Sequence, residues 1–262
     1  MLRAIRFTAL MAGIQLRAAM EYRWSFLSQV VFMILNDVFL LFFWWVVFGK
    51  FGEVGDWKMR DMLMLYAVGT TSFGLTSGLF GNVLSLSRLV VQGRLDAVLS
   101  MPPDPMLNLL VSGMNVSAWG DLLFGLTLFA LLGDTSVAGV LIFVTVSVLS
   151  AAVLLGFCLS VHSLAFFMGS AEGLAGLMSN ALVTFSLYPP GIFSGWTRFM
   201  LFTAIPAGFM TYLPVSLMKE FTMVGLLGLT AGAAACLGLG RLLFQTGLRH
   251  YESGSLVVAR GA

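Results

Sequence analysis

Long uncharged stretches separate the few charged residues of this 262-residue chain. Residues 62–87 carry no charge, and neither do residues 135–171 if histidine is neutral. A helix needs about 20 mostly apolar residues to cross the hydrocarbon core of a bilayer, so such stretches are long enough to span a membrane. Charged residues make up 10% of the chain and apolar residues 59%, whereas a soluble domain carries roughly 25% charged residues. This excludes an ordinary soluble fold.

The spacing of the charges predicts an all-α membrane protein with six transmembrane helices in a single domain, residues 1–262. We expect the spans at about residues 24–48, 62–87, 106–132, 137–162, 173–194 and 221–240. Asp37 falls within the first span and Asp121 within the third. An ionisable residue inside a membrane is costly and is a functional candidate by default. The alternatives are that each aspartate lies nearer a span end or pairs with a partner subunit.

The distribution of lysine and arginine predicts the orientation of the chain. Six spans place both ends on one side of the membrane. That side would carry nine bases, namely Arg3, Arg6, Arg17, Arg23, Arg88, Arg94, Arg241, Arg249 and Arg260. The other side would carry five, namely Lys50, Lys58, Arg60, Arg198 and Lys219. The excess predicts that both termini are cytoplasmic, the C-terminal one as a tail over residues 247–262.

Residues 1–23 have the pattern of a helix that lies on the membrane surface. Arg3, Arg6, Arg17 and Glu21 fall within one sector of a helical projection, as the polar face of an interfacial helix requires. The alternative is a cytoplasmic extension of the first span. Trp24 at the inner end of that span, and Trp44 and Trp45 at its outer end, are placed as interfacial anchors.

All seven prolines fall in two clusters, and the first of these follows the second span. Gly93 interrupts that helix, and Pro102 ends the short segment after it. Leu95, Val98 and Leu99 are spaced for one apolar helical face. The pattern predicts a short cytoplasmic helix over residues 93–102, either docked on another protein or lying as an ordinary loop helix.

The second cluster comprises Pro189, Pro190, Pro206 and Pro214. Residues 199–218 are uncharged and long enough for a seventh span. Pro206, Gly208 and Pro214 argue against a straight helix, and irregular backbone at membrane depth has to be buried in protein or line a cavity. We therefore expect two short re-entrant helices on the outer face, within residues 188–216.

The sequence offers no catalytic or metal-binding motif. Gly49-Lys50 lacks the rest of a phosphate-binding loop, and no serine has the G-x-S-x-G spacing of a nucleophile elbow. Cys158 and Cys236 lie in apolar runs without neighbouring ligands, which argues against a zinc site. The net charge of +2 is too small for a nucleic-acid partner. We expect a chain that is not an enzyme and holds no metal.

In order and topology, several short motifs resemble the membrane subunit of type-2 ABC (ATP-binding cassette) exporter permeases. They are Gly93-x-Leu95-Asp96-x-x-Leu99-x-x-Pro102, Tyr188-Pro189 with Ile192-Phe193, Ile205-Pro206, Tyr212-Leu213-Pro214, and Tyr251-Glu252-Ser253. The sequence departs from the family pattern at Met101 and His250, where arginine is more usual.

The resemblance implies a transport subunit of a bacterial cytoplasmic membrane. Two ABC ATPase subunits, which bind ATP and Mg²⁺, would pair with this permease and with a second, identical or homologous one. The residues implied in ATPase coupling are Gly93, Arg94, Leu95, Asp96, Leu99 and Pro102. Those implied in the outer re-entrant element are Tyr188, Pro189, Phe193, Pro206, Tyr212 and Pro214. The alternative is an ATP-independent channel or secondary transporter that uses Asp37 and Asp121.

Overall fold

The computed structural model describes residues 2–96, 104–168 and 171–251. Within these ranges the chain is helical, and its one extended contact is an isolated bridge between Val54 and Trp57. The all-α prediction is therefore confirmed. The longer helices are α1 (Leu2–Glu21), α2 (Arg23–Phe51), α3 (Met59–Leu79), α7 (Ala118–Leu132), α8 (Val137–Ser163), α9 (Ala171–Ser186) and α12 (Met223–Leu248). The shorter ones are η1 (Gly81–Ser85), α4 (Leu86–Val91), α6 (Pro105–Val111), η2 (Leu164–Phe166), η3 (Pro190–Ile192), α10 (Gly195–Thr203), the π-helical turn η4 (Gly208–Tyr212) and α11 (Leu213–Lys219).

Four of the described helices, α2, α3, α8 and α12, are long and apolar enough to cross a membrane. The expected spans 24–48, 137–162 and 221–240 correspond to α2, α8 and α12, and α12 continues to Leu248. Polar N-caps fix two of these helices. Ser136 Oγ accepts the amide of Gly139 at 3.1 Å, and Thr222 Oγ1 accepts that of Gly225 at 3.3 Å. The helices α7 and α9 are shorter than a full bilayer crossing, so six spans stay a prediction.

Two of the expected spans are interrupted. The predicted helix 62–87 ends at Leu79 as α3, and the predicted helix 106–132 is split into α6 and α7. The two interruptions are in contact, since the amide of Asn115 donates to the carbonyl of Ser77 in the last turn of α3 at 3.0 Å. The Asn115 side chain also accepts from the amide of Ser117 at 3.2 Å and so fixes the turn before α7. As a result Asp121 lies in the first turn of α7.

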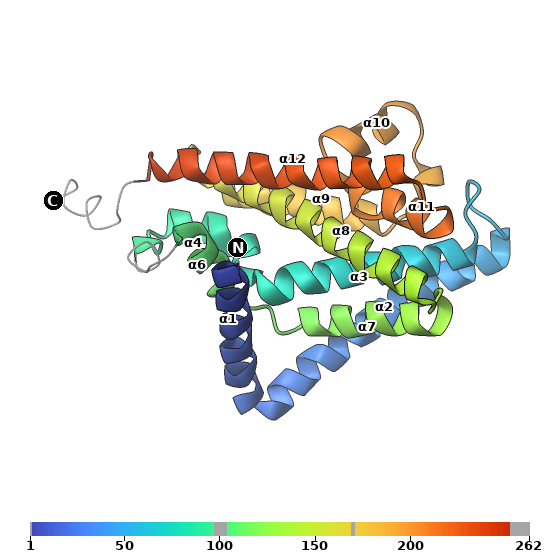
Figure 1. The fold of residues 1–262 in the computed structure, drawn as a ribbon, viewed down its shortest axis with the longest axis horizontal. Helices are drawn as coiled ribbons and strands as arrows, with labels where there is room; N and C mark the ends of the chain where they lie inside the picture. Colours follow the sequence, from blue (N-terminus) through green and yellow to red (C-terminus); the bar gives the residue numbers. More distant parts are fainter. Residues whose placement is uncertain (1, 97–103, 169–170, 252–262) are drawn as a thin grey trace.

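The N-terminal helix α1 runs across the direction of the long helices (Figure 1). The chain turns at Tyr22, whose backbone is not helical (φ −97°, ψ 69°), so residues 2–21 do not extend α2 in a straight line. Near its middle, α1 contacts the end of α6, where Gln15 Nε2 donates to the carbonyl of Ser112 at 2.7 Å. A helix held crosswise in this way suits the interfacial position that the charge pattern predicts.

The helix α3 is the most enclosed helix of the bundle and packs against α7 and α8. Hydroxyl groups connect α3 to α8: Ser72 donates to the carbonyl of Ser147 at 3.1 Å, and Thr76 donates to that of Ala151 at 3.1 Å. Such bonds between helices are favourable where water is excluded. On the other side of α8 lies α12, and α2 packs against α7 (Figure 1).

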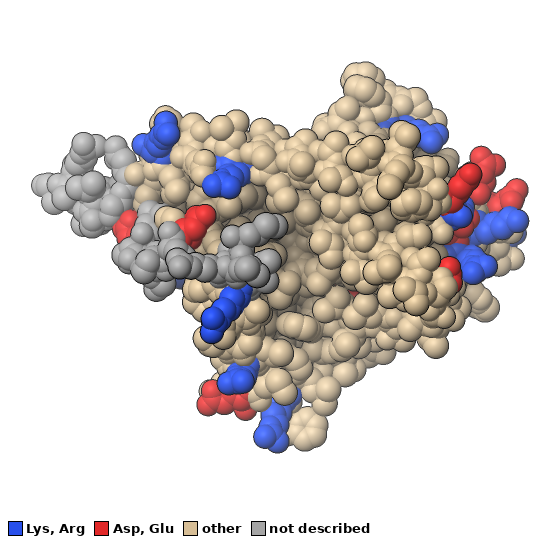
Figure 2. All heavy atoms as spheres, in the orientation of Figure 1, with Lys and Arg blue, Asp and Glu red and all other residues tan. Residues whose placement is uncertain are grey.

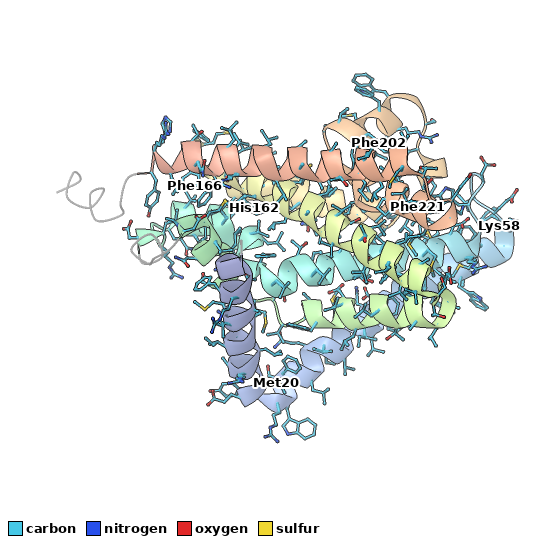
Figure 3. The ribbon with its side chains drawn as sticks, viewed as in Figure 1. Met20, Lys58, His162, Phe166, Phe202 and Phe221 are labelled. Atoms are coloured by element: carbon cyan, nitrogen blue, oxygen red, sulfur yellow. The ribbon has the colours of Figure 1, made fainter. Side chains whose placement is uncertain are left out.

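Charged residues gather over α1 and at the two ends of the molecule, with a broad uncharged band between them (Figure 2). Figure 3 places Lys58 and Phe221 at one end, and His162 and Phe166 toward the other.

Candidate functional site

The predicted coupling segment begins where α4 ends. Gly93 has a left-handed backbone (φ +65°), which favours glycine because it has no Cβ. The amide of Gly93 donates to the carbonyl of Val90 at 3.1 Å, and the amide of Arg94 donates to that of Leu89 at 3.0 Å. The Leu95 side chain is buried in the core, with 1% of its surface exposed. A buried leucine therefore anchors the start of the segment.

Arg94 and Asp96, on either side of Leu95, are exposed. Leu99 and Pro102 lie outside the described residues, and so does most of the predicted helix 93–102. The chain is described again from Asp104, whose Oδ1 accepts the amide of Met106 at 3.0 Å and caps α6. The connection is thus fixed at both ends, and two charged side chains at its start are accessible to a partner.

Tyr251, just beyond α12, adjoins the start of this segment. Burial raises the pKa of Tyr251, and the negative charge of Asp96 raises it further. The Tyr251 ring also packs edge-on against Phe166, at 6.2 Å between ring centroids, and Phe166 packs against Phe244 of α12 at 5.7 Å. The sequence motif had indicated Tyr251. Phe166 was missed, because an aromatic residue within an apolar run carries no distinguishing signal.

His162 connects the helices α4, α8 and α9 toward one end of the molecule (Figure 3). It lies at the end of α8, as a span boundary there would require, and is buried. Its Nδ1 lies 2.9 Å from the Ser87 hydroxyl of α4, and its Nε2 lies 3.2 Å from the Ser179 hydroxyl of α9. Because α4 leads directly into the coupling segment, this side chain ties that segment to α8 and α9.

The outer element between α9 and α12 departs from a straight helix, as the prolines predict. The axis turns by 77° between α10 and the continuous η4–α11 helix. Pro206 lies buried at this turn, and Pro214 is buried in the first turn of α11. Pro189 is the extended residue before η3. The geometry fits either a re-entrant loop or a broken span, so the re-entrant assignment stays a prediction.

Aromatic contacts hold this element against the helices around it. Tyr188 packs edge-on against Trp44 of α2 at 5.4 Å, and Phe193 packs likewise against Phe185 of α9 at 5.6 Å. Trp44 is buried, so its predicted role as an exposed membrane anchor is wrong, whereas Trp24 and Trp45 are exposed. Tyr188 and Phe193 thus contact different helices on the outer side.

Tyr212 is the most connected of the predicted outer residues. Its hydroxyl donates to the carbonyl of Phe185 at 2.6 Å, near the end of α9. The ring packs against Phe202 of α10 and against Trp57 before α3, each at 6.4 Å. One residue earlier, Thr211 Oγ1 donates to the carbonyl of Ser186 at 2.8 Å. These bonds fix η4 to the end of α9.

A charged cluster lies at the start of α3 and the end of α11. Lys219 Nζ forms an ion pair with Asp61 Oδ2 at 2.9 Å and lies 5.3 Å from the centre of the Trp57 ring. Asp61 Oδ2 also accepts the amide of Lys58 at 3.0 Å, which caps α3. Lys219 and Asp61 line a cavity of about 370 Å³, and Arg60 and Asp134 also line it. None of these residues formed part of a predicted site.

Asp37 lies in the middle of α2, and Asp121 lies in the first turn of α7. Each residue is 3% exposed, and the helices that carry them pack against each other. Within the described residues no group of three or more histidine, cysteine, aspartate or glutamate residues is placed to hold a metal ion. Cys158 and Cys236 are free thiols.

An apolar groove of about 700 Å³ lies between α8, α10 and α12. Phe157, Met178, Phe202 and Phe209 supply its larger side chains, and Gly232 lies on its α12 wall. The volume is within the range of small-molecule sites, and the lining suits an apolar ligand.

Comparison with known families decides the class of the protein. The family model described as "ABC-2 family transporter protein" matches residues 34–255, which are most of the chain. The chain belongs to the ABC-2 transporter family. Comparisons with curated proteins and with solved structures give no match.

Membership of the ABC-2 family makes this chain an integral, multi-pass membrane protein and the permease subunit of an ABC transporter. A permease of this family works with an ABC ATPase. The coupling segment, the outer element and the aspartate pair all lie within the matched residues.

Proposed function

We propose that this permease belongs to an ATP-driven exporter, in which two permeases, identical or homologous, pair with two ABC ATPase subunits. Substrate would pass along the interface between the permeases. The ATPase subunits would bind ATP and Mg²⁺, and this chain would bind neither, since its sequence lacks a phosphate-binding loop. The family match carries the proposal.

Residues 93–102 form the ATPase-docking segment in this proposal. Leu95 is buried while Arg94 and Asp96 beside it are exposed, which suits a segment that is anchored in the permease and presents charges to a partner. His162 ties α4 to α8 and α9, and Phe166 links Tyr251 to α12. ATP would close the ATPase dimer and push the two docking segments together. Because the contacts of His162 and Phe166 join the docking segment to the long helices, this movement would rotate those helices.

The outer element, residues 188–216, acts as the exit gate in this proposal. Tyr212 and Thr211 fix it to the end of α9, and Tyr188 contacts α2. Movement of α9 or α2 would therefore displace it directly. In this proposal both termini and the docking segment lie in the cytoplasm of a bacterium and the outer element lies on the opposite face; the arginine excess of the sequence supports this orientation.

The proposal is tested by reconstituting the permease with its ATPase partner in liposomes. Asp96→Ala and Leu99→Ala should abolish vanadate-sensitive transport and leave basal ATP hydrolysis intact, since neither substitution changes the ATPase subunits. Glu53→Gln, an exposed acid at the opposite end of the molecule, is the control and should transport normally. Transport that survives in both docking variants would contradict the assignment. If the permease alone moved substrate without ATP, the channel or secondary-transporter alternative would replace it.

A further inference from the structure

The cavity beside the Lys219–Asp61 ion pair lies at one end of the bundle. It is enclosed by the starts of α3 and α8 and by the ends of α7 and α11. Figure 3 places Lys58, just before α3, and Phe221, just after α11, at this end. Figure 2 shows charged residues gathered there, next to the uncharged band. The volume of about 370 Å³ is within the range of small-ligand sites.

Two bases and two acids line the cavity, and only two of these four charges are paired. Lys219 and Asp61 neutralise each other at 2.9 Å. In the part of the chain that the structure describes, Arg60 and Asp134 have no ion-pair partner. Asp134 accepts two hydrogen bonds from Ser136, but an ionised carboxylate has about four acceptor sites and can accept more. One positive and one negative charge of the lining are therefore available to a ligand.

The other side chains of the lining are apolar. They are Met64, Phe129, Leu132, Ile142, Val215 and Met218. Gly139 also lines the cavity, and a Cβ there would overlap the carbonyl oxygen of Asp134 and lie 2.7 Å from its carboxyl carbon. The glycine thus lets Asp134 lie against the start of α8. A lining that is part charged and part apolar suits a ligand with a zwitterionic head and an apolar remainder.

Residues around the cavity are those expected at the surface of a bilayer. Leu131 and Val137, on either side of Asp134, are exposed although they are apolar, which suits contact with lipid. The Trp57 ring lies 5.3 Å from Lys219 Nζ, and tryptophan is enriched at the level of lipid headgroups. The charges of the cavity therefore lie where a lipid headgroup would lie, beside apolar side chains that its acyl chains could contact.

The two available charges match the two charged groups of one kind of headgroup. Arginine binds phosphate through two parallel hydrogen bonds, and a carboxylate accepts hydrogen bonds from an ammonium group. We propose that the cavity binds the headgroup of a phosphatidylethanolamine molecule, with Arg60 holding the phosphate and Asp134 the primary ammonium. A trimethylammonium headgroup has no N–H to donate to Asp134, and an anionic headgroup without an amine would leave Asp134 unpaired. The bound lipid would join α11, at the end of the outer element, to α3, α7 and α8.

This site is additional to the proposed ATP coupling, and its test uses the purified permease without ATPase. Delipidated permease is titrated in detergent with phosphatidylethanolamine, phosphatidylcholine or phosphatidylglycerol of the same acyl chains, and native mass spectrometry counts the bound lipids. The first phosphatidylethanolamine should bind about tenfold more tightly than the first phosphatidylcholine, because it alone donates a charged hydrogen bond to Asp134. Soluble phosphoethanolamine carries the same charges without acyl chains and should displace the lipid poorly.

Substitutions separate the two charges. Arg60→Gln should weaken binding of both phosphatidylethanolamine and phosphatidylcholine about tenfold, since both carry the phosphate. Asp134→Asn should weaken phosphatidylethanolamine alone, to the level of phosphatidylcholine. Arg198→Gln in α10 and Asp56→Asn before α3 change exposed residues outside the lining and are the matched controls. All four residues are exposed, so the variants should fold, and thermal unfolding checks this.

Four results would each overturn the proposal. They are equal affinity of the wild type for phosphatidylethanolamine and phosphatidylcholine, unchanged binding in Arg60→Gln, an equal loss in Arg198→Gln, and an equal loss of both lipids in Asp134→Asn. Tighter binding of phosphatidylglycerol than of phosphatidylethanolamine would make this an anion site instead. Displacement by phosphoethanolamine at the concentration of the lipid would make it a site for a soluble ligand. Neither of these two outcomes is compatible with a zwitterionic lipid site.

Discussion

The backbones of Gly156 in α8 and Gly240 in α12 are in direct contact. A Cβ on Gly240 would lie 2.7 Å from the carbonyl oxygen of Gly156, and a Cβ on Gly156 would overlap the backbone of Cys236 and Leu237. In a membrane, helices associate through close packing and not through burial from water, so small residues at the contact are decisive. The two glycines therefore set how near α12 can lie to α8.

Gly156→Ala and Gly240→Ala should each lower the free energy of unfolding by about 1–3 kcal/mol, because the added methyl groups force the backbones apart. The control is Gly238→Ala, two residues away on α12, where nothing lies within 4 Å of the new Cβ. Alanine is the better helix former by about 1 kcal/mol, so the control should be neutral or stabilising. Thermal unfolding of the three variants in the same nanodiscs checks this. Equal stability of Gly240→Ala and Gly238→Ala would contradict the packing argument.

The sequence could predict the long helices because bilayer thickness alone sets the spacing between charges. It could not predict the break after Leu79 or the split between α6 and α7, which meet through the Asn115–Ser77 bond between distant segments. Nor could the sequence show which glycines lie at close contacts between helices. Gly74 does bring α3 against α7, but Gly228 has open space around it.

The candidate site residues also divide into those whose local structure the sequence could predict and those whose contacts depend on the fold. Glycine permits and proline restricts the conformation of its own backbone, so the helix ends near Gly93 and the prolines could be predicted from the sequence. The contacts of Phe166 with Tyr251 and of Tyr212 with Phe185 join segments that only the fold brings together. Asp37 and Asp121 could be recognised singly as intramembrane acids. Their burial depends on the packing of the helices, which the sequence does not show.

Asp61 should matter more to stability than its ion-pair partner Lys219. The pair is partly exposed, so Lys219→Met should cost at most about 1 kcal/mol, and less at high salt. Asp61→Ala removes the same pair and also the bond to the Lys58 amide that caps α3, which adds about 0.5–2 kcal/mol. A double-mutant cycle in unfolding measurements separates the two contributions. Equal losses in the two single variants would show that the cap adds nothing.

The hydroxyls that hold His162 should be individually important. Ser87→Ala or Ser179→Ala would leave one buried imidazole nitrogen without its partner, at a cost of about 1–3 kcal/mol. The matched control is Ser160→Ala on α8. Its hydroxyl bonds only to the Gly156 carbonyl of its own helix, so little should be lost. Unfolding free energies of the three variants give the comparison. A control that loses as much as Ser179→Ala would argue against a special role for the histidine.

Asp134 should give the permease an acid-dependent contribution to stability. Its carboxylate accepts the amide of Ser136 at 2.9 Å and the hydroxyl of Ser136 at 3.0 Å, and these bonds lower its pKa below the ordinary value. A lowered pKa means that the contribution is present above the pKa of the unfolded chain and is lost as the pH falls through the folded one. Asp134→Asn should therefore flatten the loss of melting temperature on acidification. Asp56→Asn, which changes another exposed aspartate in the turn before α3, is the control and should keep the wild-type profile. If the acid profile of Asp134→Asn matched that of the wild type, the carboxylate would have no such role.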